Sequence, residues 1–270
     1  MAVPFDHIAS TYNTHFTQTV ISQLQRKRAW RYLEEITPEL NGLEILELTC
    51  GTGEDADLFG DRGFNIVATD LSEEMLKITQ QKVQQYSLQH KISSYYIDLD
   101  TFDETVFNKK FDLIFSNFSG INCISPGGMQ KLLKKLPSIL APGGRIVAVV
   151  MPKRCLWETI HFMMRFQFSK AFRRWTNKGV QNDPDIAAKT WYYQPRLIAK
   201  WARSSFRVVR TMPVGIVVPP GYLERFFMRR KRTLFKLYSL EKKLSHFSFL
   251  SGFSDHYIID LQLKSVGSNR

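Results

Sequence analysis

The chain has 270 residues, a length that fits one α/β domain with insertions. With 44% hydrophobic and 23% charged residues it can build a sizeable core, which excludes a disordered or fibrous protein. The formal net charge of +12 is uneven, because residues 1–150 hold 14 Lys+Arg and 18 Asp+Glu whereas residues 151–270 hold 23 and 7. The basic half suits nucleic acid, an anionic membrane surface or an acidic substrate, and charge alone does not choose among them.

Apolar runs and cysteines bear on the cellular compartment. The longest apolar run, residues 146–151, is far shorter than the roughly 20 residues that cross a bilayer. The first residues lack the basic and apolar regions of a signal peptide, and Cys50, Cys123 and Cys155 have neither disulfide-framework nor zinc spacing. We therefore expect a cytoplasmic protein without a metal site.

The first half of the chain predicts alternating strands and helices. Ser72 is a good N-cap, and Gly63 is a good residue to end a helix. The predicted elements, in chain order, are a helix at 19–36, strands at 43–48 and 65–70 with a helix between them, a helix from residue 72, strands at 94–97 and 112–116, a helix at 129–140, the turn APGG and a strand at 145–151. This alternation indicates a mainly parallel, doubly wound α/β sheet.

The second half interrupts this alternation with two aromatic and basic stretches, residues 156–175 and 222–244, which we expect to be helical insertions. A helix at 195–206, entered through a proline, and a strand at 206–212 lie between them. A last strand at 256–264 completes the predicted elements.

A glycine turn, residues 50–53, lies between the first strand and the first helix. Such a turn lets a ligand approach backbone N–H groups, and with Ala56 it even fits the G-x-G-x-x-A pattern of dinucleotide-binding folds. Glu54 and Asp55, however, occupy the first helical turn, where they would repel a pyrophosphate. A phosphate-free, cationic nucleoside such as S-adenosylmethionine suits this turn better.

Asp70 ends the second predicted strand, 17 residues beyond Gly53. A carboxylate at that place can accept hydrogen bonds from both hydroxyls of a ribose. The alternative role, an N-cap for the next helix, is already supplied by Leu71 and Ser72. Asp70 is therefore predicted to hold a ribose, and any adenine nucleoside with free hydroxyls would satisfy it.

Successive segments resemble the motifs of class I S-adenosylmethionine-dependent methyltransferases. These segments are ILELTCGTGEDA, VATDLSEEML, YIDLD, FDLIFSNFSGINC and LAPGGRIVAVV. The resemblance covers residues 43–151 and continues weakly through YYQPRLIAKWARSSF. It implies a seven-stranded, mostly parallel Rossmann-like sheet with an antiparallel last strand, and S-adenosylmethionine as cofactor. Thr49 stands in place of the family's first glycine, which leaves less room beside the cofactor.

The resemblance also implies which residues contact the cofactor. They are Glu47, Thr49, Cys50, Gly51 and Gly53 for the methionine part, Asp70 for the ribose, Leu71, Met75, Asp98 and Leu99 for the adenine, Ser116 and Asn117 for the amino group, and Tyr12 and Arg26 for the carboxylate. For the last two, a core tyrosine and a solvated arginine are equally good interpretations.

Substrate residues are expected after the carboxyl ends of the parallel strands, and at the start of the antiparallel last strand that the resemblance implies. The candidates are Phe118, Asn122, Trp157, Glu158, Tyr192, Tyr193, Asp255, His256 and Tyr257, with Pro219 and Pro220 shaping the wall. If the acceptor is a hydroxyl, a base must take its proton. His256 beside Asp255 is the first candidate, with a structural strand start as the alternative, and Glu158 is the second, with an arginine partner as the alternative.

These features predict a methyltransferase that acts on a small apolar or aromatic metabolite, by O- or C-methylation. We expect one domain, with residues 43–151 as the cofactor core and residues 152–190 and 219–254 as a cap over the substrate. The basic amphipathic helix near 223–244 could lie on an anionic bilayer or pack its apolar stripe on the protein. RNA methylation, disfavoured because no RNA-binding module is recognisable, and a non-catalytic cofactor-binding protein are the alternatives.

Overall fold

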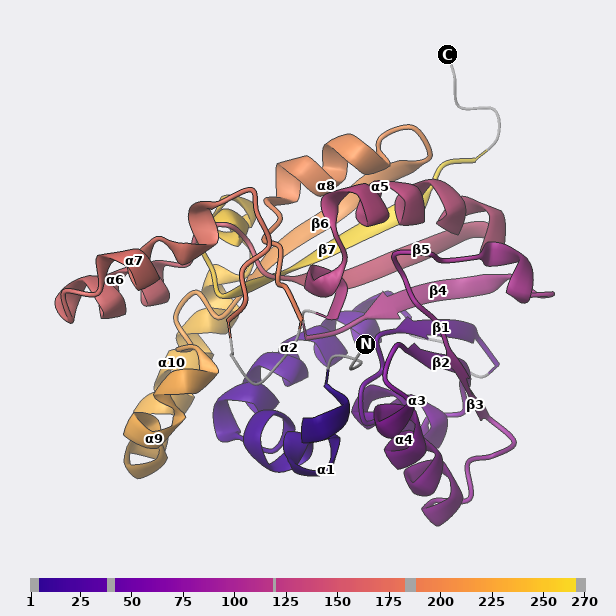
Figure 1. The fold of residues 1–270 in the computed structure, drawn as a ribbon, viewed down its shortest axis with the longest axis horizontal. Coiled ribbons are helices and arrows are strands. Elements are labelled where there is room, and N and C mark those ends of the chain that lie inside the picture. The colour runs from indigo at the N-terminus through magenta and orange to yellow at the C-terminus, as the bar shows by residue number, and fades with distance from the viewer. Residues whose placement is uncertain (1–4, 38–41, 119, 183–187, 266–270) are drawn as a thin grey trace.

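The computed structural model describes residues 5–37, 42–118, 120–182 and 188–265. In this part of the chain, seven strands form one sheet in the order β3-β2-β1-β4-β5-β7-β6, and β7 is antiparallel to both of its neighbours (Figure 1). The strands are β1 (Glu44–Leu48), β2 (Asn65–Asp70), β3 (Ile92–Tyr96), β4 (Phe111–Ser116), β5 (Leu140–Val150), β6 (Phe206–Val214) and β7 (His256–Leu263). The predicted seven-stranded, mostly parallel α/β sheet is confirmed.

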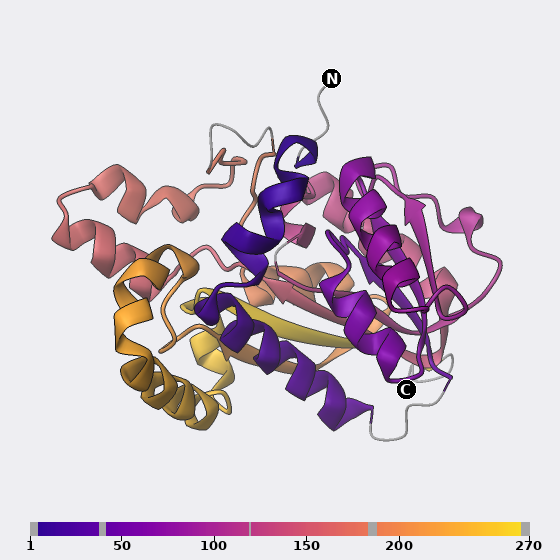
Figure 2. The same cartoon turned by 90° about the horizontal axis from the view of Figure 1, so that it is seen from below.

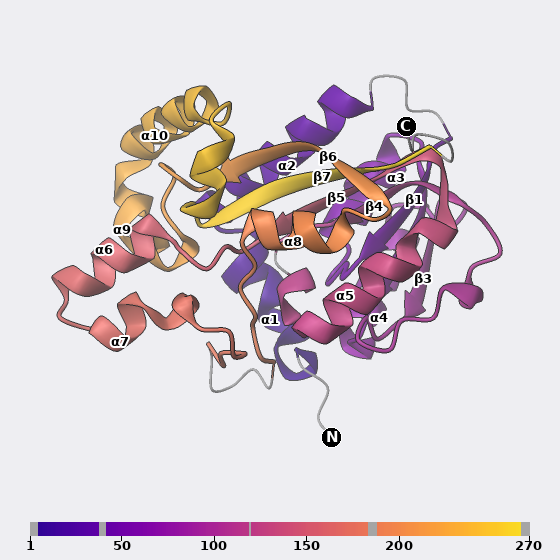
Figure 3. The ribbon, with the colours of Figure 1, turned by 90° about the horizontal axis from the view of Figure 1, so that it is seen from above.

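Helices cover both faces of the sheet. Figure 2 shows α2, α3 and α4 across one face, and Figure 3 shows α5 and α8 across the other. Each face buries its own apolar cluster, which includes Leu33 and Phe59 on the first side and Leu132 and Ile198 on the second. The helices are α1 (Ala9–Tyr12), α2 (Val20–Ile36), α3 (Glu54–Asp61), α4 (Glu73–Gln85), α5 (Pro126–Lys135), α6 (Leu156–Met164), α7 (Phe168–Ala171), α8 (Pro195–Ala202), α9 (Glu224–Phe227) and α10 (Lys231–Leu244).

Local capping signals explain where two of the helices begin. The side chain of Thr19 accepts a hydrogen bond from the N–H of Ser22, and the side chain of Ser72 accepts one from the N–H of Met75. Each bond satisfies a backbone donor that has no partner inside the helix. The predicted N-cap at Ser72 is therefore confirmed.

The predicted helix at 129–140 is wrong at both ends. α5 begins at Pro126, because a proline fits the first helical position and the preceding Ser125 side chain accepts a hydrogen bond from a backbone N–H in the first turn. It ends at Lys135, since Pro137 has no N–H to continue the α-helical ladder, and a short 3₁₀ turn follows.

The predicted turn APGG lies inside β5 rather than before it. Phe111 pairs with Leu140 and Leu113 pairs with Arg145, so the residues between Leu140 and Arg145 form an irregularity in the pairing with β4. A bulge of this kind keeps the strand in the sheet on both sides of the extra residues.

The two basic stretches are helical, as predicted, and project together beyond the β6 and β7 side of the sheet (Figures 1 and 2). The apolar stripe of α10 packs on the protein, with Leu234 and Tyr238 buried against Ile21 and Leu24 of α2. These two side chains are therefore not available to a bilayer, and membrane contact through the rest of residues 223–244 stays a prediction. Among the described helices, none combines the length and apolarity that a membrane span requires.

Two buried or half-buried carboxylates attach the second insertion to the core. Glu224 accepts hydrogen bonds of 3.0 Å from the N–H groups of Val20 and Ile21, at the start of α2. Glu241 accepts bonds of 2.7 to 3.2 Å from four successive backbone N–H groups, residues 215–218. Both acidic side chains of α9 and α10 therefore point inward.

The turn after β1 contains a β-branched residue in the left-handed region. Thr49 has a φ of 58°, which is unfavourable for threonine, and its hydroxyl donates to the carbonyl of Leu48. The backbone of Gly120 packs directly on this side chain, so that a Cβ at position 120 would overlap with the Thr49 hydroxyl. Threonine at position 49 thus requires glycine at position 120.

We expect Gly120→Ala to lower the free energy of unfolding by about 1–3 kcal/mol, because the added methyl group overpacks a side chain fixed close to the backbone. Thr49→Gly removes the side chain that the new methyl group would meet. The double variant Thr49→Gly/Gly120→Ala should therefore lose much less free energy of unfolding than the sum of the losses of the two single variants. Urea titration of the four proteins measures this coupling. Strictly additive effects would contradict the assigned contact.

Candidate functional site

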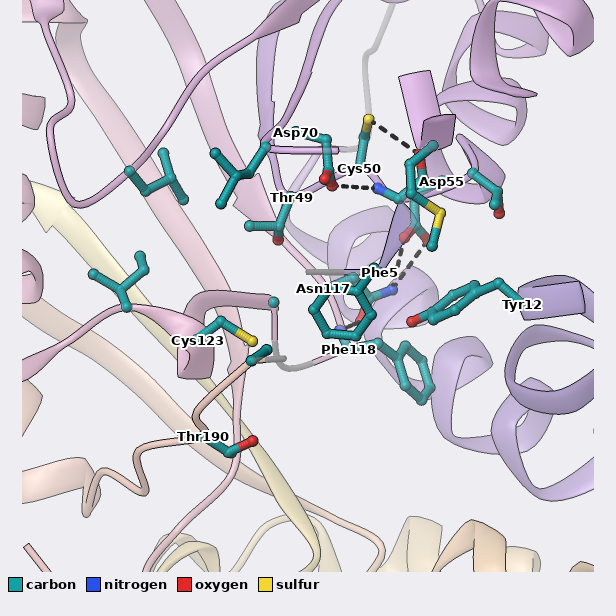
Figure 4. Close-up of a pocket in the computed structure, with 18 of the residues that line it drawn as sticks. Phe5, Tyr12, Thr49, Cys50, Asp55, Asp70, Asn117, Phe118, Cys123 and Thr190 are labelled. Carbon is teal, nitrogen blue, oxygen red and sulfur yellow. Dashed lines mark hydrogen bonds between the residues drawn. The ribbon is translucent and has the colours of Figure 1, made fainter. Parts of the chain in front are cut away.

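A cavity of about 510 Å³ opens at the carboxyl ends of β1, β2 and β4 (Figure 4). The turn after β1, Asp70, residues 97–100 after β3 and residues 117–118 after β4 form its wall, and residues 188–191 close it on another side. Open α/β sheets bind their ligands at this edge.

Eleven of the predicted cofactor residues line this cavity. They are Tyr12, Arg26, Thr49, Cys50, Gly51, Asp70, Leu71, Met75, Asp98, Leu99 and Asn117. Glu47, Gly53 and Ser116 are not among the described residues that line it, although the Ser116 hydroxyl lies 3.1 Å from that of Thr49. The contacts of these residues with a cofactor stay predictions.

The Asp70 carboxylate is held by backbone donors on both sides. Its Oδ2 accepts a 2.8 Å bond from the N–H of Gly51 (Figure 4). Its Oδ1 accepts a 2.9 Å bond from the N–H of Ser72. Burial raises the pKa of Asp70 above its ordinary value, although these N–H groups act in the opposite direction. Each oxygen keeps acceptor capacity for a ligand in the cavity, because a carboxylate oxygen has more than one acceptor site.

Asp55 is the centre of a buried polar network that sequence reasoning missed. Its carboxylate pairs with Arg26 of α2 and accepts hydrogen bonds from the indole of Trp30 and, at 3.0 Å, from the amide of Asn117. Asp55 is 3% exposed and Arg26 is 7% exposed. The interpretation of Arg26 as a solvated arginine is therefore wrong.

This network forms one side of the cavity. The Arg26 guanidinium also lies 4.6 Å from the ring centroid of Phe118, a cation–π distance. Burial raises the pKa of the Tyr12 hydroxyl to about 12, while Arg26 acts in the opposite direction, so Tyr12 is a neutral donor at physiological pH. Donors from Tyr12 and Arg26 on this side suit a ligand carboxylate.

Glu47 of β1 is a second buried acid near this network. It is 1% exposed, and its Oε2 has no hydrogen-bond partner within the described ranges. Burial, followed by the neighbouring charge of Asp55, raises the pKa of Glu47 well above its ordinary value. A positively charged group placed near this acid would favour its ionised form.

Among the predicted substrate residues, Phe118 lines the cavity, whereas Asn122 is not among its described lining residues. The Asn122 amide donates to the carbonyls of Met151 and Trp191, and its Oδ1 accepts a 2.8 Å bond from the N–H of Met151. Met151 and Trp191 both line the cavity. Asn122 therefore holds two wall residues in place.

Tyr192, Tyr193 and Trp157 lie outside the cavity wall as the structure describes it. Both tyrosines are buried, and the Tyr192 hydroxyl bonds to Asn182 while the Tyr193 hydroxyl donates to the carbonyl of Ile124. Their contacts are those of structural residues that support the wall from behind.

Glu158, the second base candidate, is engaged by two arginines. Its carboxylate lies 2.7 Å from Arg173 and 2.9 Å from Arg174, which matches the arginine-partner alternative. Arg174 also lies 2.8 Å from Asp255, next to the start of β7. This chain of buried charges attaches α6 to the sheet, and Glu158 is not among the residues that line the cavity.

His256, the first base candidate, is not among the described residues that line the cavity but packs against Phe118, which does. Its ring centroid lies 5.7 Å from that of Phe118, and its Nδ1 lies 3.2 Å from Oδ2 of Asp255. Burial raises the pKa of Asp255, but His256 and Arg174 outweigh burial and hold it well below its ordinary range. Asp255 is thus a fixed anion that can orient the imidazole.

Several wall residues carry no signal that the sequence analysis used. Cys123 and Ile124 follow β4, so the rule for strand ends could have found them. Lys189, Thr190 and Trp191 come from an irregular segment far along the chain, and no periodicity marks them.

Comparison with known proteins gives a family for the core of the chain. Residues 45–144 match the model of a family described as a methyltransferase domain. A demethylmenaquinone methyltransferase of Paenarthrobacter aurescens is 26% identical over 169 residues, which cover 61% of this chain and 62% of the relative. A malonyl-[acyl-carrier protein] O-methyltransferase of Erwinia pyrifoliae is 28% identical over 158 residues, covering 58% and 53%. The chain thus spans somewhat more than half the length of these relatives.

A solved structure supports the fold over most of the chain. Magnesium protoporphyrin IX methyltransferase from Synechocystis, with bound SAH, superposes with a TM-score of 0.58 at 14% identity and covers 90% of this chain and 85% of that one. Identity at this level shows the fold alone. Residues 45–144 are therefore similar to a methyltransferase domain, and they lie within a sheet of the same fold with a cavity at its strand ends.

Proposed function

We propose that this chain transfers a methyl group from S-adenosylmethionine to a small molecule with an apolar or aromatic region. The observation that carries the proposal is the cavity in which the glycine turn, Asp70 and Asp98 come together, within the segment that matches a methyltransferase domain. Eleven residues expected from the family pattern share this one cavity, which a chance motif match would not produce.

The residues of the cavity fit the cofactor better than a dinucleotide. Asp70 would accept hydrogen bonds from the ribose hydroxyls, and Leu71 and Met75 would contact the adenine. The backbone of residues 50–53 would approach the methionine part. S-adenosylmethionine supplies an electrophilic methyl group on a positively charged sulfur. A pyrophosphate would instead meet the Asp55 and Asp70 carboxylates, with Arg26 already paired.

The chain's own contribution to methyl transfer is alignment and exclusion of water. In-line displacement at a methyl carbon needs a nucleophile held at near-attack distance, and a dry site favours it. Phe118, Ile124, Met151 and Trp191 give the cavity an apolar wall on the side of β4, β5 and the first insertion. This wall supports an apolar or aromatic acceptor. Residues 188–190 support a cap role for the first insertion, 152–190, whereas none of the described lining residues comes from 219–254.

For a hydroxyl acceptor, His256 is the proposed general base. Asp255, fixed as an anion by Arg174, would orient the imidazole and stabilise its protonated form. His256 lies behind Phe118, which lines the cavity, so the base role requires that the acceptor hydroxyl reach the imidazole past Phe118.

Replacing Asp70 by asparagine should weaken binding of S-adenosylmethionine by about 10- to 100-fold, because hydrogen bonds to a charged acceptor contribute about 1.5–3 kcal/mol. Isothermal titration calorimetry measures the dissociation constant. Asp61→Asn, an exposed position on α3, is the matched control and should bind like the unaltered protein. Equal affinity of the two variants would remove Asp70 from the cofactor site.

Transfer of a labelled methyl group from S-adenosylmethionine into a fractionated cell lysate tests the acceptor class. We expect the label in organic-soluble small molecules, because the cavity wall is largely apolar. Label in RNA would favour the RNA methyltransferase alternative. Absence of label from every fraction, with cofactor binding intact, would favour a non-catalytic cofactor-binding protein.

With a hydroxyl acceptor in hand, His256→Gln should lower kcat by about 100-fold or more, the usual contribution of a general base, and leave the affinity for S-adenosylmethionine unchanged. The exposed His246 provides the control variant His246→Gln, which should retain full turnover. Full turnover of His256→Gln would eliminate the base role and leave His256 as a structural residue at the start of β7.

A further inference from the structure

The two insertions meet in a lobe, defined here as residues 156–175 and 221–232, beyond the β6 and β7 side of the sheet (Figure 1). The ring of Tyr222 joins them, with its centroid 5.3 Å from that of His161 and 5.8 Å from that of Phe162. In all three ribbon views the lobe lies at the end of the molecule opposite β3. It is therefore a single projecting surface.

The lobe exposes an apolar stripe of unusual extent. Leu156, Ile160, Met163 and Met164 recur at the spacing of one helical face of α6, and all four are exposed. The stripe continues through the exposed residues Phe166, Phe168, Phe172 and Trp175. Met164 is 77% exposed and Phe166 is 82% exposed. So many large apolar side chains exposed on one lobe mark an interaction surface.

Every exposed charge of the lobe is positive. The lobe has two acidic residues. Glu158 is buried and paired with Arg173 and Arg174, and Glu224 accepts hydrogen bonds from backbone N–H groups at the start of α2. The exposed charged residues are Arg165, Lys170, Arg225, Arg229, Arg230, Lys231 and Arg232. The fold thus removes the negative charges from this surface and leaves a cationic rim around an apolar stripe.

We propose that this lobe docks the protein on an anionic phospholipid bilayer. Apolar side chains of the stripe would enter the boundary between headgroups and acyl chains, while the Lys and Arg side chains contact lipid phosphates. This surface differs from the α10 stripe, which is buried against α2. The docking does not depend on the identity of the methyl acceptor.

Two other occupants fit the surface less well. Single-stranded RNA would use the aromatic rings and the cations, but the aliphatic Leu156, Ile160 and Met164 have no base-stacking role and gain most from an apolar phase. A second copy of the chain would bring one cationic rim against another, and like charges repel.

Co-sedimentation with vesicles tests the proposal. The protein should bind vesicles of phosphatidylcholine mixed with phosphatidylglycerol, bind pure phosphatidylcholine far more weakly, and lose affinity as salt rises. Met164→Ser/Phe166→Ser should weaken binding by at least about tenfold, because two large apolar side chains no longer leave water. Arg229→Glu/Arg230→Glu should also weaken binding by at least about tenfold, because two cations that attract an anionic surface become anions that it repels.

The matched control changes two exposed aromatic residues at the opposite end of the sheet. Tyr95→Ser/Tyr96→Ser on β3 should bind vesicles like the unaltered protein. Circular dichroism of each variant verifies that the fold is intact.

Three results would overturn the docking proposal. The first is failure of the unaltered protein to bind anionic vesicles. The second is vesicle binding that both lobe variants retain. The third is a different occupant: RNA binding without vesicle binding, or a dimer in solution that Met164→Ser/Phe166→Ser dissociates.

Discussion

The carboxylate of Asp70 joins the two turns that form the floor of the cavity. One oxygen accepts from the N–H of Gly51 in the turn after β1, and the other accepts from the N–H of Ser72 at the start of α4. The orientation of Asp70 is therefore fixed by the backbone before any ligand enters, which is the condition for a precise binding site. The same bonds keep the glycine turn open toward the cavity.

A second constraint concerns where the charges lie. The chain carries a net charge of +12, yet the acidic groups at or beside the cavity include the buried Glu47 and Asp55 and the half-buried Asp70. Arg26 compensates Asp55 and is itself held against Phe118. The excess positive charge instead lies on exposed surfaces, above all on the two insertions. The molecule thus separates a carboxylate-rich cavity from a cationic exterior, and each suits a different kind of partner.

Local signals in the sequence were sufficient where the structure depends on neighbours in the chain. The Ser72 cap, the β2 strand and the glycine turn are all set by a few consecutive residues. Local signals were insufficient where a contact joins segments that are distant in the chain. Arg26 and Asp55 lie on different helices, so no periodicity reveals that they pair. The same holds for Arg174 and Asp255, which are 81 residues apart in the chain.

The second insertion shows a related limit. From the sequence, its apolar stripe could face either a bilayer or the protein. The structure shows that Leu234 and Tyr238 of this stripe pack on α2. The stripe of α6, in contrast, is exposed, although its periodicity is the same as that of a helix packed in a core. Periodicity alone does not tell which apolar helical face is buried against the rest of the protein.

A crystal structure with S-adenosylhomocysteine, the demethylated product, tests the central claim most directly. The account predicts the adenosine in the cavity, with both ribose hydroxyls within hydrogen-bond distance of the Asp70 carboxylate and the amino acid part beside residues 49–53. An empty cavity under saturating ligand, or a parallel soak in which NAD takes this place, would contradict it.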